Sequence, residues 1–269
     1  MKLGLYLRNM GPQSATDTIV ACARAAEEAG IDDLWVADHI AIPPDDAEGS
    51  GGRYLDPLAT LAFLAGMTRR IGLGTGVLVL PYRPPLATAK WIATIQELSG
   101  GRLLLGVGAG WMEAEFRAVG VPRDQRSKIT DQTLAFLHRC FAQDEGEING
   151  QRFLFRPRPA RPPIFIGGAA PHGLRRSTKY GDGWMPMGGD PVALRPFVDQ
   201  LRQQMTTAGK PNPEVVVITS LALEDGAKAS DQIQRLAEIG ATRVVHAWRY
   251  PDAAAFARTA DALRRVLPA

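Results

Sequence analysis

The sequence predicts an α/β fold in which eight parallel strands alternate with helices and close into a (β/α)8, or TIM, barrel. Two observations support this. Short apolar segments, mostly without an in-out alternation, recur along the chain, as expected for strands buried on both faces. Each is followed by a segment with helical spacing, and eight such units favour a closed barrel over an open sheet. We expect residues 1–269 to form one barrel domain.

The first two units have clear boundaries. A strand at residues 3–7 precedes a helix that should begin at Ser14, because Asp17 three positions later resembles a capping box. Gly30 ends this helix. The second strand, residues 33–37, is followed by a loop at 43–57 and a helix at 58–68.

The third strand, residues 71–78, has glycine at alternate positions, which indicates either a bulge or a close approach to the backbone. A helix then begins at Pro84-Pro85 and stops at Gly100-Gly101. The fourth strand, residues 103–107, leads into a glycine-rich turn and a polar helix start. A long helix is expected at 123–141.

A small hairpin should interrupt the alternation before the fifth strand, with an Asn149-Gly150 turn between residues 147–148 and 152–155. An irregular run at 157–163 follows. The remaining strands and helices share the pattern of the first half. The strands are residues 164–166, 183–185, 215–219 and 242–246, and the helices are residues 174–180 and runs marked by Leu194 to Met205, Ile233 to Ala237 and Phe256 to Leu267.

Composition excludes several classes of protein. Hydrophobic residues make up 45% of the chain, and 31 basic against 28 acidic side chains give a net charge of only +3. No basic block suggests a nucleic-acid partner. No apolar run approaches the roughly 18 residues of a membrane helix, and the short apolar N-terminus is not typical of a signal peptide. Cys22 and Cys140 are expected to be buried thiols in a cytoplasmic protein.

In a TIM barrel, function lies at the carboxyl ends of the strands. None of the six lysines falls there, which argues against Schiff-base chemistry. The histidines are not paired in the way a binuclear metal site requires. The strand ends instead carry glycine, tryptophan and few titrating groups, which suits a large flat cofactor. The residues expected at this mouth are Arg8, Asn9, Asp38, His39, Gly76, Val77, Gly108, Ala109, Gly110, Trp111, Gly167, Gly168, Trp184, His246 and Trp248.

Five motifs carry a resemblance to a known family. They are A-D-H at 37–39, G-T-G-V-L at 74–78, S-G-G-R-L-L-L-G-V-G-A-G-W at 99–111, P-P-I-F-I-G-G at 162–168 and G-D-G-W at 181–184. In this order they resemble the luciferase-like flavin and deazaflavin oxidoreductases, the superfamily of bacterial luciferase and the coenzyme F-420-dependent dehydrogenases. The form of the glycine turn is more similar to the deazaflavin branch.

The resemblance implies a cofactor site. It places a non-proline cis peptide at Gly76–Val77 behind the cofactor ring, with Asp38 and the turn at 108–111 beside it. The cofactor phosphate would lie on the loop of Gly168, Ala169, Ala170 and Gly173, before a helix N-terminus that favours anions. Arg126 matches an arginine that reaches this phosphate, although an ordinary solvated arginine is an equal alternative.

The resemblance also implies roles for side chains at the mouth. His39 would lie near the reactive ring atom as a hydrogen-bond donor or general acid/base. Glu115 matches an acidic position of the family, or else only caps its helix. Trp111 stands where the family's sugar-phosphate dehydrogenase has a glutamate, which argues against a sugar-phosphate substrate. Trp111, Trp184 and Trp248 would wall the pocket, with core packing as the alternative for Trp184.

These features predict an oxidoreductase that transfers a hydride between coenzyme F-420 and a small organic substrate. An FMN-dependent monooxygenase and a catalytically silent flavin-binding barrel are the alternatives. The family also implies a homodimer. A further hypothesis is that an arginine cluster around the hairpin meets the oligoglutamate tail of the deazaflavin; its members are Arg152, Arg156, Arg158 and Arg161.

Overall fold

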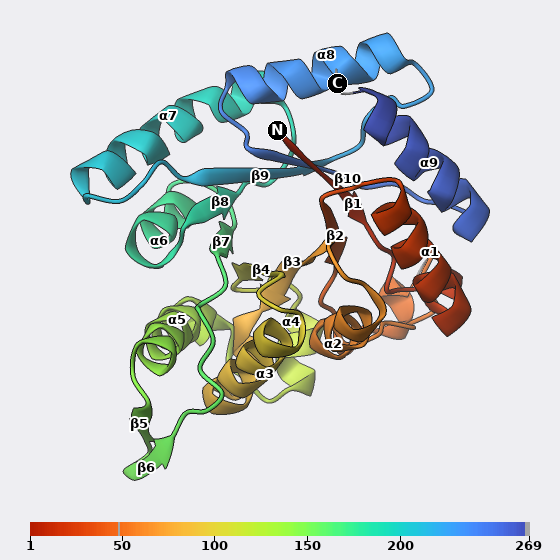
Figure 1. Ribbon diagram of the computed structural model, residues 1–269. Coiled ribbons are helices and arrows are strands. Elements are labelled where there is room, and N and C mark those ends of the chain that lie inside the picture. The colour runs from red at the N-terminus through yellow and green to blue at the C-terminus, as the bar shows by residue number, and fades with distance from the viewer. Residues whose placement is uncertain (48, 267–269) are drawn as a thin grey trace.

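The computed structural model describes residues 1–47 and 49–266, and its centre is a closed barrel of eight parallel strands (Figure 1). Neighbouring strands are hydrogen-bonded around the ring. In ring order they are β1 (Lys2–Tyr6), β10 (Arg243–His246), β9 (Glu214–Thr219), β8 (Gly183–Met185), β7 (Ile164–Gly167), β4 (Leu103–Gly108), β3 (Gly72–Val79) and β2 (Asp33–Val36). The predicted TIM barrel and its eight strands are confirmed.

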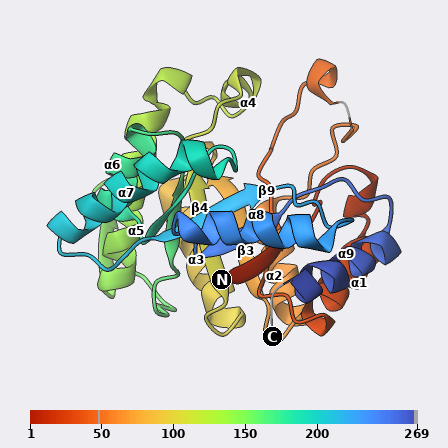
Figure 2. The same cartoon turned by 90° about the horizontal axis from the view of Figure 1, so that it is seen from above.

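Helices surround the strands, and α4 lies in a loop rather than in this outer ring (Figures 1 and 2). Their bounds agree with the expected ones to within a few residues. They are α1 (Thr16–Glu28), α2 (Pro57–Met67), α3 (Pro85–Leu98), α4 (Glu113–Ala118), α5 (Arg126–Ala142), α6 (His172–Tyr180), α7 (Pro191–Thr207), α8 (Gly226–Glu238) and α9 (Ala253–Val266). Leu267, expected on the last helix, lies outside the described residues.

The predicted capping box at Ser14 is wrong. Helix α1 begins at Thr16, and its N-cap residue is Ala15, which makes no side-chain cap. The hydroxyl of Ser14 instead donates to the Gly11 carbonyl at 2.7 Å and accepts from the side chain of Arg53 at 2.7 Å. A long-range contact therefore uses the oxygen that a local cap would need.

The glycines of β3 make room for large side chains inside the barrel. A Cβ atom on Gly74 would lie 2.4 Å from the indole of Trp35, and one on Gly76 would lie 2.9 Å from Ile218. Trp35 is fully buried against Phe165 at the centre of the barrel. The register of β3 against β4 also shifts between Thr75 and Leu78, so both expected explanations, close approach and irregularity, hold here.

The expected hairpin is present as β5 (Glu145–Ile148) and β6 (Gln151–Leu154), with Asn149 and Gly150 at positive φ in the turn. It follows α5 and precedes β7. Helix α5 runs from the mouth toward the amino ends of the strands, and the chain enters the hairpin at the end of this helix. The hairpin therefore lies toward the amino ends of the strands, where it projects beside α5 (Figure 1).

This position argues against the hypothesis that the arginine cluster meets the oligoglutamate tail of a deazaflavin bound at the mouth. Each arginine is also already paired with a carboxylate of the chain: Arg152 with Glu145, Arg156 and Arg158 with Asp144, and Arg161 with Asp182. The Arg158–Asp144 distance is 2.6 Å and the Arg161–Asp182 distance is 2.7 Å. The cluster supports local structure.

The loops that follow the strands gather at one end of the barrel. In Figure 2, α4 and the orange loop between β2 and α2 project from the same end. These two segments supply Glu115 and His39, which meet there as described below. Within residues 1–47 and 49–266, no helix is long and apolar enough to cross a membrane.

Candidate active site

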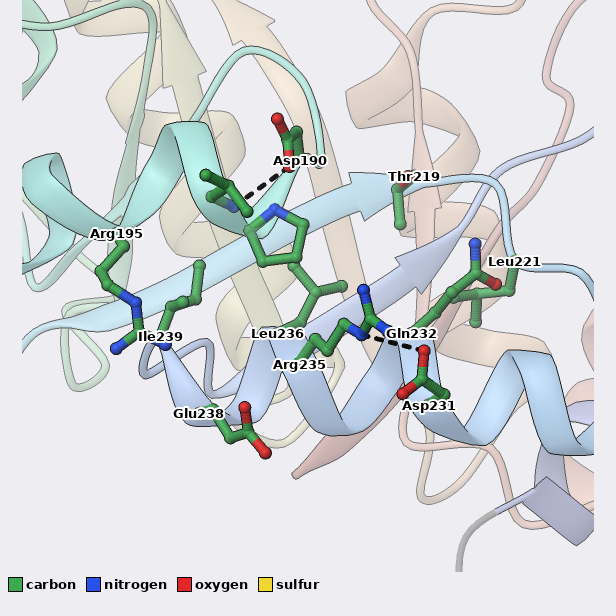
Figure 3. Close-up of a pocket in the computed structure, with 13 residues that line it drawn as sticks. Asp190, Arg195, Thr219, Leu221, Asp231, Gln232, Arg235, Leu236, Glu238 and Ile239 are labelled. Atoms are coloured by element: carbon green, nitrogen blue, oxygen red, sulfur yellow. Dashed lines mark hydrogen bonds and ion pairs between the residues drawn. The ribbon is translucent and has the colours of Figure 1, made fainter.

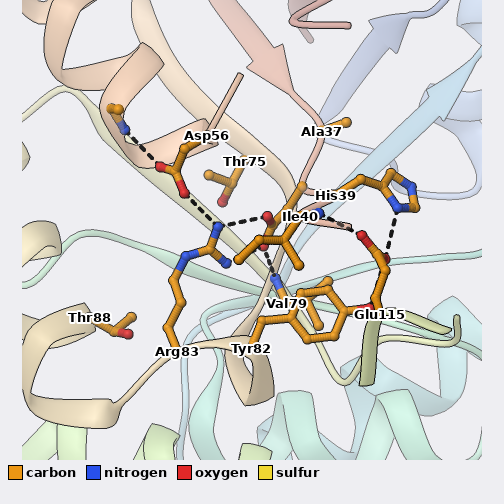
Figure 4. A network of polar contacts seen from close by, with 12 residues as sticks. Ala37, His39, Ile40, Asp56, Thr75, Val79, Tyr82, Arg83, Thr88 and Glu115 are labelled. Atoms are coloured by element: carbon orange, nitrogen blue, oxygen red, sulfur yellow. Dashed lines mark hydrogen bonds and ion pairs between the residues drawn. The ribbon is translucent and has the colours of Figure 1, made fainter. Parts of the chain in front are cut away.

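His39 and Glu115 form the polar centre of the mouth (Figure 4). His39 follows β2, and its Nδ1 lies 3.0 Å from the carboxylate of Glu115, although the two residues are 76 positions apart. The side chain of His39 is 21% exposed, whereas that of Glu115 is 1% exposed. The histidine is thus accessible from the mouth, while its acidic partner is shielded from water.

The carboxylate of Glu115 is fully hydrogen-bonded. It accepts from the backbone N–H groups of Ile40 at 2.5 Å and Ala41 at 3.0 Å, and from the hydroxyl of Tyr82 at 2.9 Å. Burial alone would raise the pKa of Glu115, but the hydrogen bonds from His39, Ala41 and Ile40 outweigh it and lower the pKa to about 2. Glu115 is therefore ionised at neutral pH and does not serve as a simple helix cap.

Asp38 lies behind this pair and is buried. Its carboxylate accepts a bidentate pair of hydrogen bonds from Arg83, at 2.6 and 2.8 Å, and one from the N–H of Val79 at 2.8 Å (Figure 4). Arg83 also contacts Asp56 at 2.7 Å. Burial alone would lower the pKa of Arg83, but these carboxylates raise it above its usual value. Asp38 therefore fixes the loop after β3.

The Gly76–Val77 peptide bond is cis, as the resemblance implied. The side chain of Val77 lies against two glycines of neighbouring strands, because a Cβ atom on Gly108 or Gly167 would come within 2.7 Å of it. Val77 itself is partly exposed. The side chain of Val77 therefore covers these two glycines where β3, β4 and β7 lie side by side.

The turn after β4 continues this surface. Ala109 and Gly110 are partly exposed, and Gly110 has φ of 77°, beside Val79 and Phe116. Trp111 is 66% exposed, and its ring stands edge-on to His39 with 6.3 Å between centroids. Tyr54 lies on the loop before α2, and the centroid of its ring is 5.0 Å from that of His39. His39 is thus flanked by two aromatic side chains.

The predicted phosphate loop follows β7 and leads into α6. Gly168 has φ of 126°, Ala169 is exposed, and no side chain caps the N-terminus of α6. Gly173 packs so closely on this loop that a Cβ atom there would lie 2.6 Å from the Gly168 carbonyl. The loop therefore offers backbone groups and the positive end of a helix dipole to an anion.

Arg126 begins α5, the helix beside α6. Its guanidinium donates to the Arg123 carbonyl at 3.0 Å, and the residue is partly exposed. Arg176 of α6 joins the two helices through Asp131 at 2.6 Å and Ser127 at 2.8 Å. The first turn of α5 is thus fixed against α6, which leaves both expected roles of Arg126 open.

Two of the expected tryptophans pack against other parts of the barrel rather than beside His39. Trp184 is 1% exposed, and its indole N–H donates to the Gly168 carbonyl at 2.8 Å, so it packs in the core and supports the phosphate loop from below. Trp248 stacks on His246, with 4.6 Å between ring centroids. His246 and Trp248 both line a cavity beside α9. Burial lowers the pKa of His246 to about 4, which keeps its imidazole neutral at pH 7.

Sequence reasoning missed Tyr82, Arg83 and Tyr54. Tyr82 and Arg83 lie in the loop between β3 and α3, and Tyr54 lies in the loop between β2 and α2. No motif marks them in the sequence. Their one indication was position, because loops after barrel strands carry functional residues in this fold.

Another cavity, of about 420 Å³, lies between α7 and α8 (Figure 3). Within its wall, the carboxylate of Asp190 accepts from the N–H of Val192, and Arg235 binds Asp231 at 2.9 Å. None of the residues predicted for the active site lines it. No group of three or more His, Cys, Asp or Glu residues within the described ranges is arranged to hold a metal ion.

Residues 1–266 match the luciferase-like monooxygenase family, so the chain belongs to that family. Its members include oxidoreductases and monooxygenases.

Two relatives and one solved structure are similar to the chain. A protein of Mycobacterium tuberculosis described as uncharacterised is 31% identical over 250 residues, covering 86% of this chain and 85% of its own length. The F-420-dependent hydroxymycolic acid dehydrogenase of the same organism is 31% identical over 188 residues, covering 66% of this chain and 51% of its own length. The crystal structure of the monooxygenase RslO1 from Streptomyces bottropensis shares the fold, with a TM-score of 0.84 at 18% identity over 99% and 98% of the chains.

Proposed function

We propose that the protein is an oxidoreductase that transfers a hydride between the deazaflavin coenzyme F-420 and a small organic substrate. The observation that carries this proposal is the pairing of two features at one mouth. One is the surface of Val77, Gly108 and Gly167, where the two glycines add no side chain to that of Val77. The other is His39, a titratable group held by a buried carboxylate at the same end of the barrel.

The residues present fit such a coenzyme. A broad ring can lie flat where few side chains project, and Gly108, Gly110 and Gly167 add none beside Val77. A phosphate would be held by Gly168, Ala169, Ala170 and the N-terminus of α6. When bound, the coenzyme supplies the group that accepts or donates the hydride.

The protein's own contribution is binding, orientation and proton management. His39 is the accessible titratable side chain of the pair, and we assign it the proton that moves to or from the substrate. Tyr54 and Trp111 flank its ring. Asp38 contributes indirectly, because its ion pair with Arg83 fixes the loop behind the cis peptide.

The choice of F-420 is supported by the glycine-turn motif and by the similarity to the F-420-dependent dehydrogenase. The alternative is an FMN-dependent monooxygenase, which the family description and the likeness to RslO1 favour. A catalytically silent flavin-binding barrel is the remaining candidate.

Titration of the purified protein with F-420 and with FMN separates these candidates. We expect F-420 to bind more tightly and to change redox state when an alcohol, aldehyde or imine substrate is added. Tighter binding of reduced FMN, with oxygen consumption, would support the monooxygenase instead. Binding without turnover on any of these substrate classes would support the silent protein.

We also propose that the protein forms a homodimer through α2 and α3. Helix α2 contains no charged residue, although it lies on the outside of the barrel. Large apolar side chains on both helices are exposed: Phe63 at 44%, Trp91 at 47% and Leu98 at 66%. Apolar side chains gathered in this way mark an association surface, and a second copy of the chain offers a matching one.

A further inference from the structure

The two oxygens of the Glu115 carboxylate have different partners. Oε1 accepts both backbone N–H groups of the loop after β2, those of Ile40 and Ala41. Oε2 accepts from the hydroxyl of Tyr82 and contacts Nδ1 of His39 (Figure 4). One oxygen thus fixes the backbone of the loop, and the other fixes the imidazole that the loop carries.

We propose that Glu115 is a positioning residue that fixes the tautomer of His39, with the proton on Nδ1 and the lone pair of Nε2 free at the mouth. This proposal rests on the proposed function for its catalytic meaning. An ionised carboxylate only accepts hydrogen bonds, so the Nδ1 atom facing it must carry the proton. Neutral imidazole then has an unprotonated Nε2.

The surroundings of the ring leave Nε2 available. Nε2 makes no hydrogen bond to any residue within 1–47 and 49–266, and the neighbours of the ring are the aromatic groups of Tyr54 and Trp111. The other nearby acid, Asp38, is occupied by Arg83 and Val79. Glu115 is therefore the carboxylate that determines which nitrogen of His39 is protonated.

The conservative variant Glu115→Gln makes the proposal testable, because an amide has only one accepting end. Its oxygen would stay with the two backbone donors, Ile40 and Ala41, since turning it away would leave both N–H groups facing an NH2 group. The NH2 group would then face Nδ1 of His39. Nδ1 would have to accept, and the proton would move to Nε2.

The experiment is ¹⁵N NMR of the histidine side chains in the cofactor-free protein. The chain has four histidines, so a His39→Asn variant identifies the resonances of His39. We expect Nδ1 of the wild-type protein to be protonated and Nε2 unprotonated in the neutral ring, and we expect Glu115→Gln to reverse the two. Glu113→Gln is the matched control, because Glu113 is exposed and faces Arg123 at 3.5 Å.

A wild-type ring protonated on Nε2 would overturn the proposal without any variant. An unchanged tautomer in folded Glu115→Gln would also overturn it. Tyr82→Phe removes the other donor to Oε2 and should keep the wild-type tautomer, so it tests the assignment even when Glu115→Gln does not fold.

Kinetics distinguish this proposal from the proposed function. With an active substrate, Glu115→Gln should lower kcat by at least about 10²-fold with little change in KM, because a general acid/base contributes roughly that much. If Glu115→Gln switches the tautomer but the wild-type protein turns over neither F-420 nor FMN, the positioning role of Glu115 stands and the proposed function is rejected. Full activity after the switch would reject the role of Glu115.

Discussion

At the scale of single residues, two buried carboxylates fix different parts of the mouth. Asp38 binds Arg83 and fixes a loop, whereas Glu115 binds His39, which the mouth exposes. Sequence motifs located Asp38 and His39, and the family resemblance singled out Glu115, but neither revealed that Glu115 contacts His39 or that Arg83 binds Asp38. The reason is sequence distance: Glu115 is 76 residues from His39 and 33 from Tyr82, and no local pattern encodes such contacts.

The depressed pKa of Glu115 predicts a loss of stability in acid. Because the folded value of about 2 lies below the ordinary 4.5, Glu115 stabilises the fold fully above pH 4.5, and this contribution disappears as the pH falls toward 2. Between pH 5 and pH 3, wild type should lose about 2 kcal/mol more unfolding free energy than Glu115→Gln. Urea unfolding of both proteins at the two pH values measures this, and equal losses would show that Glu115 is not held ionised.

At the scale of secondary structure elements, the strands and their glycine stops could be predicted well. Buried strands are apolar on both faces, and Gly100 and Gly101 have the positive φ that ends the preceding helix. The start of α1 was missed because Arg53, from a distant loop, engages Ser14. The arginine cluster could not be placed from the sequence, because charge density alone does not show which end of the barrel a hairpin occupies.

The packing of Trp35 on β3 predicts a contrast between two glycines. Gly74→Ala should destabilise the protein by about 1–3 kcal/mol, because the added methyl group overlaps a rigid buried indole. Gly66→Ala in α2 meets open space and should be neutral or stabilising by up to about 1 kcal/mol. Thermal unfolding of both variants tests this, and equal melting temperatures would argue against close packing at Gly74.

At the scale of the whole molecule, the barrel brings its two predicted cofactor segments to one end. The ring surface comes from β3, β4 and β7, and the phosphate loop comes from the end of β7, so one ligand can reach both. The fold that creates this arrangement could be predicted from sequence. The residue contacts that shape the substrate pocket could not, because they lie between loops without regular geometry.

The phosphate loop predicts a charge effect on coenzyme affinity. Ala169→Glu places a negative charge on an exposed position beside the α6 N-terminus and should weaken binding of F-420 by about tenfold at low salt. A deazaflavin without the phosphate should be unaffected. Arg156→Glu, in the hairpin at the other end of the barrel, is the control and should bind normally. A larger loss in Arg156→Glu would restore the tail hypothesis.

The proposed dimer predicts a change in mass. Light scattering should give about twice the chain mass of 29.1 kDa for wild type and the chain mass for Trp91→Asp. Val192→Asp, at a more exposed apolar position on α7, should remain dimeric. A monomeric wild type would reject the proposal, and a dimeric Trp91→Asp would place the interface elsewhere.

The most direct test of the account is a crystal structure of the protein grown with oxidised F-420. We expect the deazaflavin ring to lie on Val77 between Gly108 and Gly167, with one ring face toward His39, and the phosphate to contact residues 168–173. A coenzyme bound in the cavity between α7 and α8, or a mouth that holds FMN and excludes F-420, would contradict it.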